Sequence, residues 1–342
     1  MFVGGEFYTE QRWLQANRTI DSRGMHFLNG GRACLRVIAD YLRQHGIHSV
    51  LLPDYLCPSI AQILTSCGLQ LAYYQVNPDL SVDTTNLLQK HTQQQAVYFI
   101  NYFGFLPTPQ MRFFWQSLQA AGTLLIEDNA QAGSVPQPLG DFVFNSLRKW
   151  VPYDGAYLFS RLDLSATLRQ YPSQPSNPRL ALIRAYRAGL AAYLLDRIGD
   201  HETLTAQFAQ AESYYESAEV IWGDAVERDR IEHLDWRGIR QKRRENYCAL
   251  LDWLAGIPGV QPLFGALLPD VMPLGLPVYC HALPRDTLYE RLGSVSIATT
   301  IHWVGTPATF AHQMLTLPID QRVTLKQLGY LAERLLWAVE AI

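Results

Sequence analysis

Two short apolar runs, each ending in polar residues, indicate how this chain folds. They are Thr123-Leu-Leu-Ile-Glu-Asp-Asn-Ala-Gln131 and Phe142-Val-Phe-Asn-Ser-Leu-Arg-Lys-Trp150. Their length and their aliphatic and aromatic composition predict buried strands over residues 123–127 and 142–146. Asp128 and Ser146 then fall at the ends of two strands, and Lys149 follows the second strand closely.

The chain around these runs alternates strand patterns with helix patterns. We expect further strands at residues 48–53, 69–76, 96–101 and 156–160, and helices at 58–67, 82–89 and 110–121. Such alternation is typical of a mainly parallel sheet covered on both faces, which gives a three-layer α/β domain. Ligands of open α/β sheets gather at the carboxyl ends of the strands, where Asn101, Asp128 and Ser146 fall.

The rest of the chain predicts a second, smaller unit. Residues 179–232 have helical periodicity without a recognisable motif. After them we expect helices at residues 235–254, 285–292 and 324–342, and strands at 276–282 and 296–303. We therefore predict a large domain over residues 1–234 and a small C-terminal α+β domain over residues 235–342.

Composition narrows the class of protein. The chain has 342 residues, 48% of them hydrophobic, and a net charge of −3, which gives no general attraction to nucleic acid or anionic membranes. The dense basic run at residues 237–244 is typical of a solvated helix face. The five cysteines show neither metal-ligand spacing nor a disulfide framework, so we expect no metal site. Without a secretory signal or a membrane-spanning pattern, a cytoplasmic location is expected.

Asp128 and Lys149 together suggest a specific chemistry. One large class of pyridoxal phosphate (PLP) enzymes attaches the cofactor aldehyde to a lysine as a Schiff base, and an aspartate keeps the pyridine nitrogen protonated. Gln131 would hydrogen-bond the phenolic oxygen of the ring, and Ser146 would contact the phosphate. Each residue also has a structural interpretation, because an Asp at a strand end often caps a helix and a lysine is usually a surface charge.

Two further features could bind ligands. In Phe27-Leu-Asn-Gly-Gly-Arg-Ala-Cys-Leu35, the pair Gly30 and Gly31 opens a helix that runs to about residue 46. Backbone N–H groups at such a helix start can hold a phosphate, although paired glycines before a helix usually form only a turn. His302, at the end of an apolar strand, could face a substrate or could be a hydrogen-bonded structural residue.

With these residues in place, the sequence resembles the DegT/StrS family of PLP-dependent sugar aminotransferases, which have the aspartate aminotransferase-like fold. The segment Ile126-Glu-Asp-Asn-Ala-Gln131 is similar to the Glu-Asp-Ala-Ala-Gln signature of the family, and a lysine follows downstream. Similar segments also occur at residues 49–55, 101–104, 243–247, 276–279, 301–303 and 317–319. The resemblance covers residues 27–159 and 237 to the C-terminus.

The resemblance implies a role for each matching residue. Lys149 would be the Schiff-base lysine and proton shuttle, Asp128 would contact the pyridine nitrogen, and Gln131 the ring oxygen. Gly30, Gly31 and Ser146 would surround the phosphate. The resemblance also implies a homodimer with active sites at the subunit interface. The reaction would move an amino group, usually from glutamate, to a nucleotide-linked keto sugar.

The chain departs from the family pattern at one position that matters for the cofactor. Where the family commonly has an aromatic residue that stacks on the ring, this chain has Cys57. Stacking would then fall to Tyr55, to Tyr102 or to no aromatic residue. Two alternatives remain open: another PLP chemistry on the same scaffold, such as a lyase or dehydratase reaction, or a non-catalytic binding or regulatory protein.

Overall fold

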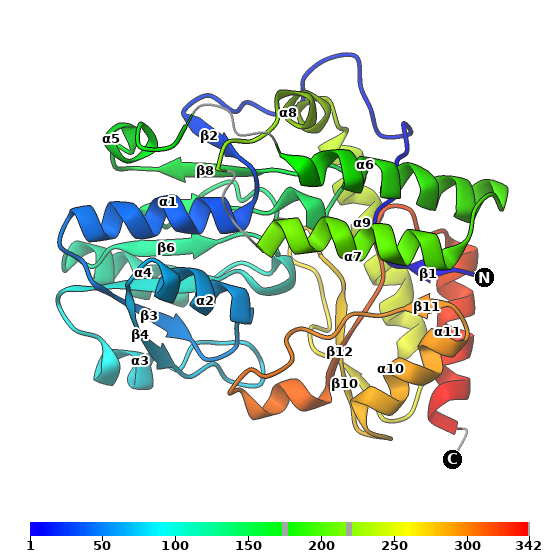
Figure 1. Cartoon of the computed structure of the whole chain (residues 1–342). Coiled ribbons are helices and arrows are strands. Elements are labelled where there is room, and N and C mark those ends of the chain that lie inside the picture. The colour runs from blue at the N-terminus through cyan, green and yellow to red at the C-terminus, as the bar shows by residue number, and fades with distance from the viewer. Residues whose placement is uncertain (173–176, 217–220, 341–342) are drawn as a thin grey trace.

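A seven-stranded sheet with the strand order β2-β8-β7-β6-β5-β3-β4 organises the larger part of the molecule. Figure 1 labels β2, β8, β6, β3 and β4 of this sheet. The computed structural model describes residues 1–172, 177–216 and 221–340. β8 is antiparallel to both its neighbours, whereas the pairs among β3 to β7 are parallel. The strands are β2 Met25–Leu28, β3 Ser49–Pro53, β4 Gln70–Tyr74, β5 Gln95–Ile100, β6 Leu125–Asp128, β7 Phe142–Phe144 and β8 Ala156–Ser160.

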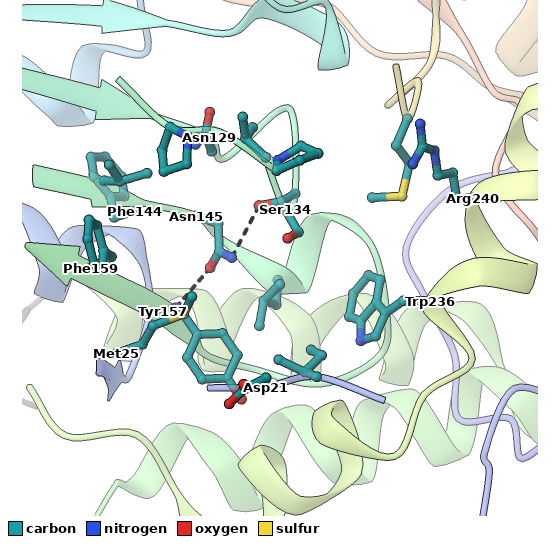
Figure 2. A pocket seen from close by; sticks show the side chains of 18 of the residues that line it. Asp21, Met25, Asn129, Ser134, Phe144, Asn145, Tyr157, Phe159, Trp236 and Arg240 are labelled. Atoms are coloured by element: carbon teal, nitrogen blue, oxygen red, sulfur yellow. Dashed lines mark hydrogen bonds between the residues drawn. The ribbon is translucent and has the colours of Figure 1, made fainter. Parts of the chain in front are cut away.

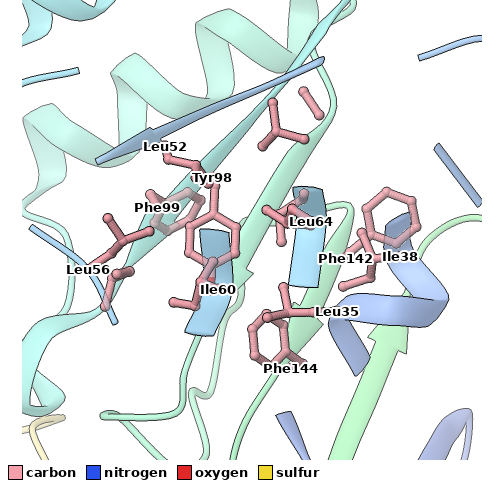
Figure 3. Close-up of a cluster of buried hydrophobic side chains, with 14 of the residues drawn as sticks. Leu35, Ile38, Leu52, Leu56, Ile60, Leu64, Tyr98, Phe99, Phe142 and Phe144 are labelled. Atoms are coloured by element: carbon pink, nitrogen blue, oxygen red, sulfur yellow. The ribbon is translucent and has the colours of Figure 1, made fainter. Parts of the chain in front are cut away.

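Helices cover this sheet on both faces. Neighbouring residues of β5 show the two faces, because side chains alternate along a strand. Tyr98 lies on the side of α1 and α2, near Phe144, whereas Phe99 stacks on Trp115 of α4 with ring centroids 4.7 Å apart. Figure 3 shows apolar residues of α1 and α2 packed beside Tyr98, Phe142 and Phe144. These helices are α1 Gly31–Gln44, α2 Pro58–Ser66, α3 Thr84–Lys90, α4 Pro109–Ala120 and α5 Ser165–Leu168.

Local signals explain where several helices begin. α4 starts after Thr108, whose side chain accepts a hydrogen bond from the backbone N–H of Met111, and Pro109 occupies the first turn. Asp83 and Asp235 cap α3 and α9 in the same way. Such caps satisfy backbone donors that have no partner within the helix.

The C-terminal part builds a second apolar core around a three-stranded antiparallel sheet, in the order β12-β10-β9. The cluster includes Val3 of β1, which pairs with Ile297 of β11, so the first residues pack with the C-terminal unit. The domain boundary at residue 234 stays a prediction. The elements are β1 Val3–Gly4, β9 Val260–Pro262, β10 Leu276–Cys280, β11 Ile297–Ala298, β12 Met314–Leu317, α9 Trp236–Leu254, α10 Arg285–Ser294 and α11 Leu325–Glu340.

The three-layer α/β fold with a mainly parallel sheet is confirmed, and some strands differ from expectation. β2 was not expected, and it pairs antiparallel with β8 at the edge of the sheet. Within the predicted strand at 296–303 only β11 forms, and β12 takes the place beside β10. A short apolar run does not reveal its partner, because pairing depends on contacts distant in sequence.

The helical interpretation of residues 179–232 holds for the part that is described. It contains α6 Pro178–Ala191, a π-helical turn at Ala192–Asp196, α7 His201–Glu216 and α8 Ala225–Glu232. Residues 217–220 of this segment, and residues 341–342 of the predicted final helix, lie outside the described residues. In the ranges that are described, no helix is both long and apolar enough to cross a membrane.

The basic run at residues 237–244 is not simply a solvated helix face. Arg243 on α9 is 1% exposed, and its guanidinium donates to Gln321 and to the carbonyls of Pro273 and Leu274. Burial lowers the pKa of Arg243 to about 10. This arginine therefore holds α9 against two loops.

Removal of the Trp115 ring should test the packing of α4 on the sheet. Trp115 is 1% exposed and Phe113, on the same helix, is 73% exposed. We expect Trp115→Ala to lower the free energy of unfolding by about 3–5 kcal/mol, because it leaves a cavity beside Phe99. Phe113→Ala should change it by less than about 0.5 kcal/mol. Urea denaturation of both variants measures the difference, and equal losses would contradict this packing.

Candidate functional site

A cavity of about 110 Å³ lies at the carboxyl ends of β5, β6 and β7, beside the N-termini of α1 and α2. Several polar side chains that the sequence spreads over more than a hundred residues meet there. The polar and charged lining includes Arg32, Asp128, Gln131, Ser146, Arg148 and Lys149.

Strand register brings Asp128 and Lys149 together. β6 and β7 are parallel neighbours with Asp128 opposite Phe144, so both strands end at the same edge of the sheet. A short 3₁₀ turn, Leu147–Lys149, follows β7 and returns the chain toward Asp128. The charges of Asp128 and Lys149 influence each other's pKa, as expected for neighbours in one cavity.

Each carboxylate oxygen of Asp128 accepts a hydrogen bond in the described structure. One oxygen accepts from the hydroxyl of Tyr98 at 2.6 Å and the other from the backbone N–H of Ala130 at 2.7 Å. Burial raises the pKa of Asp128, and the charge of Lys149 acts in the opposite direction. A buried carboxylate in this position favours a cationic partner such as a protonated pyridine nitrogen.

Lys149 is shifted toward its neutral form. Burial lowers the pKa of its amine, and the charge of Asp128 partly offsets this effect. A lysine acts as a nucleophile only when its amine is neutral, so the cavity prepares Lys149 for attack on a carbonyl group.

Gln131 presents an unused hydrogen-bond donor. Its Oε1 accepts from the backbone N–H of Phe103 at 2.9 Å, and its Nε2 is buried without a hydrogen-bond partner in the described structure. Because an unsatisfied buried donor is costly, this amide is suited to a ligand oxygen within the cavity. The phenolic oxygen of a pyridoxal ring is such an acceptor.

The first turn of α1 can accept an anion. Gly30 precedes the helix, which has no side-chain cap and no acidic residue in its first turn. A Cβ added to Gly31 would lie 3.4 Å from the Phe144 ring and 3.6 Å from Cβ of Ser146, so the backbone approaches the Ser146 segment closely. The backbone N–H groups of this turn, the helix dipole, Arg32 and the Ser146 hydroxyl together suit a phosphate.

Not every predicted site residue lines the cavity. Asn101 lies outside the lining and donates to Glu127 and Asn129, at 3.0 and 2.6 Å. Since Ile100 pairs with Asp128, side-chain alternation turns Asn101 away from it. Glu127 in turn accepts the backbone N–H groups of Leu139 and Gly140, so Asn101 belongs to a buried structural cluster.

Tyr55 and His302 lie behind the cavity wall. Tyr55 is fully buried, and its hydroxyl donates to the backbone carbonyl of His302. His302 has its Nδ1 3.2 Å from the Thr316 hydroxyl oxygen. Burial, together with the charge of Lys149, lowers the pKa of His302 to about 3, so His302 lies near the cavity although it does not line it.

Tyr98, Arg32 and Trp303 were not among the predicted site residues. Tyr98 could have been found from strand periodicity, because it lies two residues before Ile100 and shares its face. Arg32 directly follows the glycine pair. Trp303 gave no local signal, because a loop far along the chain brings it to the cavity.

Buried ion pairs attach the lysine turn to the helical segment that carried no motif. Asp154 pairs with Arg187 at 2.8 Å and with Arg179, and all three side chains are at most 3% exposed. Glu212 of α7 pairs with both Arg179 and Arg148, the residue before Lys149. The segment therefore supports the turn that carries Lys149.

A larger cavity of about 650 Å³ lies behind Phe144. Figure 2 shows Tyr157, Phe159 and Trp236 around it, with Arg240 at one side. Its described lining is mostly apolar and contains neither Asp128 nor a lysine. This cavity is larger, but the polar and charged side chains described above line the smaller cavity.

In the described ranges 1–172, 177–216 and 221–340, no group of three His, Cys, Asp or Glu residues is placed to hold a metal ion.

Comparison with known proteins identifies the fold. No protein-family model matches the chain, and no curated protein sequence matches it. Among solved structures, the aminotransferase TlmJ from Streptoalloteichus hindustanus is 16% identical with a TM-score of 0.69, and the match covers 100% of both chains.

Two further solved structures agree with this result. The sugar aminotransferase CalS13 from Micromonospora echinospora is 17% identical with a TM-score of 0.66, over 98% of this chain and 100% of that chain. The putative sugar aminotransferase Spr1654 from Streptococcus pneumoniae, in its PLP form, is 14% identical with a TM-score of 0.64, over 97% and 93%. The chain therefore has the fold of these aminotransferases.

Loss of Asp154 should test the ion pairs behind the lysine turn. Asp154→Ala leaves two buried guanidinium groups without their shared carboxylate, and we expect the free energy of unfolding to fall by about 3–5 kcal/mol. Asp21→Ala removes an acid from the exposed pair with Arg23 and should leave stability unchanged. Chemical denaturation compares the two variants, and a fully stable Asp154→Ala would contradict the role assigned to this network.

His302 should make stability depend on pH. Its pKa falls from 6.5 to about 3 in the folded chain. Below pH 6.5 the unfolded chain binds the additional proton, so the folded state loses stability as the pH falls. We expect this residue to lower the free energy of unfolding by roughly 1 kcal/mol as the pH falls from 7 to 5.5. His302→Gln should flatten the pH dependence of the free energy of unfolding more than His201→Gln does, a substitution of an exposed histidine at the start of α7. Equal slopes in the wild type and His302→Gln would contradict the shift.

Proposed function

We propose that this chain is a PLP-dependent aminotransferase that transfers an amino group to a nucleotide-linked or related keto sugar, in the biosynthesis of amino sugars or polysaccharides. Glutamate is the proposed donor. The observation that carries the proposal is the meeting of Asp128, Gln131, Ser146 and Lys149 in one cavity, beside the α1 N-terminus. The fold shared with sugar aminotransferases supports the substrate class.

The residues present suit PLP in their chemistry. Lys149 would hold the aldehyde carbon, Asp128 the pyridine nitrogen, and the unpartnered Nε2 of Gln131 the ring oxygen. Gly30, Gly31 and Ser146 would surround the phosphate, with added positive charge from Arg32. Asn101 and Tyr55 would act indirectly, through the packing of the β5 and β3 ends.

Bound PLP would supply an aldehyde for amine exchange and a ring that accepts electrons from the reacting carbon. The protein would provide the proton transfers and the charges. Asp128, kept from water by burial, would hold a proton on the ring nitrogen. Lys149 would act as general base and acid and move a proton at the reacting carbon of the substrate amine. Burial lowers the pKa of Lys149, which makes its neutral amine easier to form.

The proposal extends to assembly and location. The resemblance to sugar aminotransferases supports a homodimer with active sites at the subunit interface, acting on small molecules in the cytoplasm. It also supports the division into a PLP-binding domain over residues 1–234 and a small domain over 235–342. His302 would act near the substrate, as a neutral imidazole given its low pKa.

Attachment of the cofactor is the direct test. Wild-type protein incubated with PLP should develop a visible absorbance band, and borohydride reduction should fix the cofactor on a peptide that contains Lys149. Lys149→Ala should lose the band, whereas Lys326→Ala, an exposed control on α11, should keep it. A wild-type protein that takes up no PLP, or attachment at another lysine, would refute the proposal.

Transamination is tested with the donor alone. Glutamate added to the PLP-loaded wild type should remove the visible band and release 2-oxoglutarate, and a nucleotide-linked keto sugar should then restore it. A stable band with every common amino donor would instead favour another PLP chemistry. Lys149→Ala should reduce the rate of donor conversion by at least about a thousandfold, because the proton transfer loses its base.

A further inference from the structure

One part of the cavity wall comes from a region far along the chain. Trp303 is the lining residue contributed from beyond Lys149 in the described structure. Its indole packs on Tyr55 with ring centroids 5.0 Å apart at an angle of 54°, and on His302 at 5.6 Å. Since it is only partly buried, part of its surface is available to the cavity.

Hydrogen bonds on both sides hold this indole in place. The Tyr55 hydroxyl donates to the carbonyl of His302, just before Trp303. Three residues later, the hydroxyl of Thr306 donates to the carbonyl of Asp54 at 2.6 Å. The loop is thus attached at two points to the connection between β3 and α2, so Trp303 has a defined position.

Next to Trp303 along the cavity wall lies the small side chain of Cys57. Cys57 precedes the first turn of α2 and lines the same cavity, and its thiol lies 3.1 Å from the Ser59 hydroxyl. A thiol covers little of a planar ring, whereas an indole offers a broad aromatic face. A protonated pyridine ring, flat and positively charged, is stabilised by such a face.

We infer that Trp303 supplies the aromatic surface against the cofactor ring, in place of the aromatic residue that Cys57 replaces at the start of α2. The inference rests on the proposed PLP function and extends it to a residue from the C-terminal part. Trp303 thereby contributes to cofactor affinity and to the environment of the ring, while Lys149 contributes the covalent attachment.

The test separates ring contact from covalent attachment. In a Lys149→Ala background, PLP binds without the covalent bond, and equilibrium dialysis gives its dissociation constant. Trp303→Leu in this background should weaken binding roughly five- to tenfold, the range expected for loss of one aromatic contact. Trp303→Phe should stay within about twofold, because it keeps an aromatic face.

Phe310→Leu is the matched control. Phe310 packs on Tyr55 at 5.1 Å, on the same aromatic cluster as Trp303, but it does not line the cavity. This variant should leave the dissociation constant unchanged. If Phe310→Leu weakens binding as much as Trp303→Leu does, the effect comes from packing around Tyr55, and the inference is overturned.

A spectroscopic readout in the Lys149-containing protein completes the experiment. The circular dichroism of the PLP absorbance band should change in Trp303→Leu and persist in Trp303→Phe, since an adjacent indole or phenyl ring imposes an asymmetric environment. Unchanged affinity and an unchanged band in Trp303→Leu would overturn the inference while the PLP function stands. A wild type that binds no PLP would refute both.

Discussion

The burial of opposite charges at the end of β6 and after β7 is the constraint on which the rest of the site depends. Neither Asp128 nor Lys149 is at its ordinary pKa, because the cavity removes both from water. Each is partly compensated by the other, which lowers the cost of burial without removing it. A ligand with a cationic ring nitrogen and an electrophilic carbon would satisfy both groups at once.

The surrounding protein limits the ways in which this pair can relax. Hydrogen bonds from the Tyr98 hydroxyl and the backbone N–H of Ala130 hold the Asp128 carboxylate in place. Glu127, one residue earlier, points to the other face and holds the following turn through Leu139 and Gly140. Asp128 and Glu127 are adjacent acids of β6 with different roles. Asp128 faces the cavity and Glu127 stabilises the fold, because neighbouring side chains of a strand point to opposite faces.

The outline of the fold and the cavity polar residues were predictable from sequence, because both depend on local patterns. Alternating strands and helices predicted the sheet, and the ends of β6 and β7 predicted where Asp128, Gln131, Ser146 and Lys149 gather. Asn101 does not line the cavity, contrary to expectation. It comes one residue after Ile100, the register partner of Asp128, and side-chain direction reverses at each residue of a strand. β12 and Trp303 could not be predicted, since their positions depend on contacts with segments distant in sequence.

The ion pairs of Asp154 join segments that the ribosome synthesises at different times. Asp154, which follows the turn that carries Lys149, pairs with Arg187 on α6 and donates its backbone N–H to Glu227 on α8. Synthesis proceeds from the N-terminus, so the lysine turn exists long before the helices that hold it. Until α6 and α8 have been synthesised, Asp154 lacks the partners that it has in the folded protein, so the support behind the Lys149 turn is completed only after the cavity residues up to Lys149 have been made.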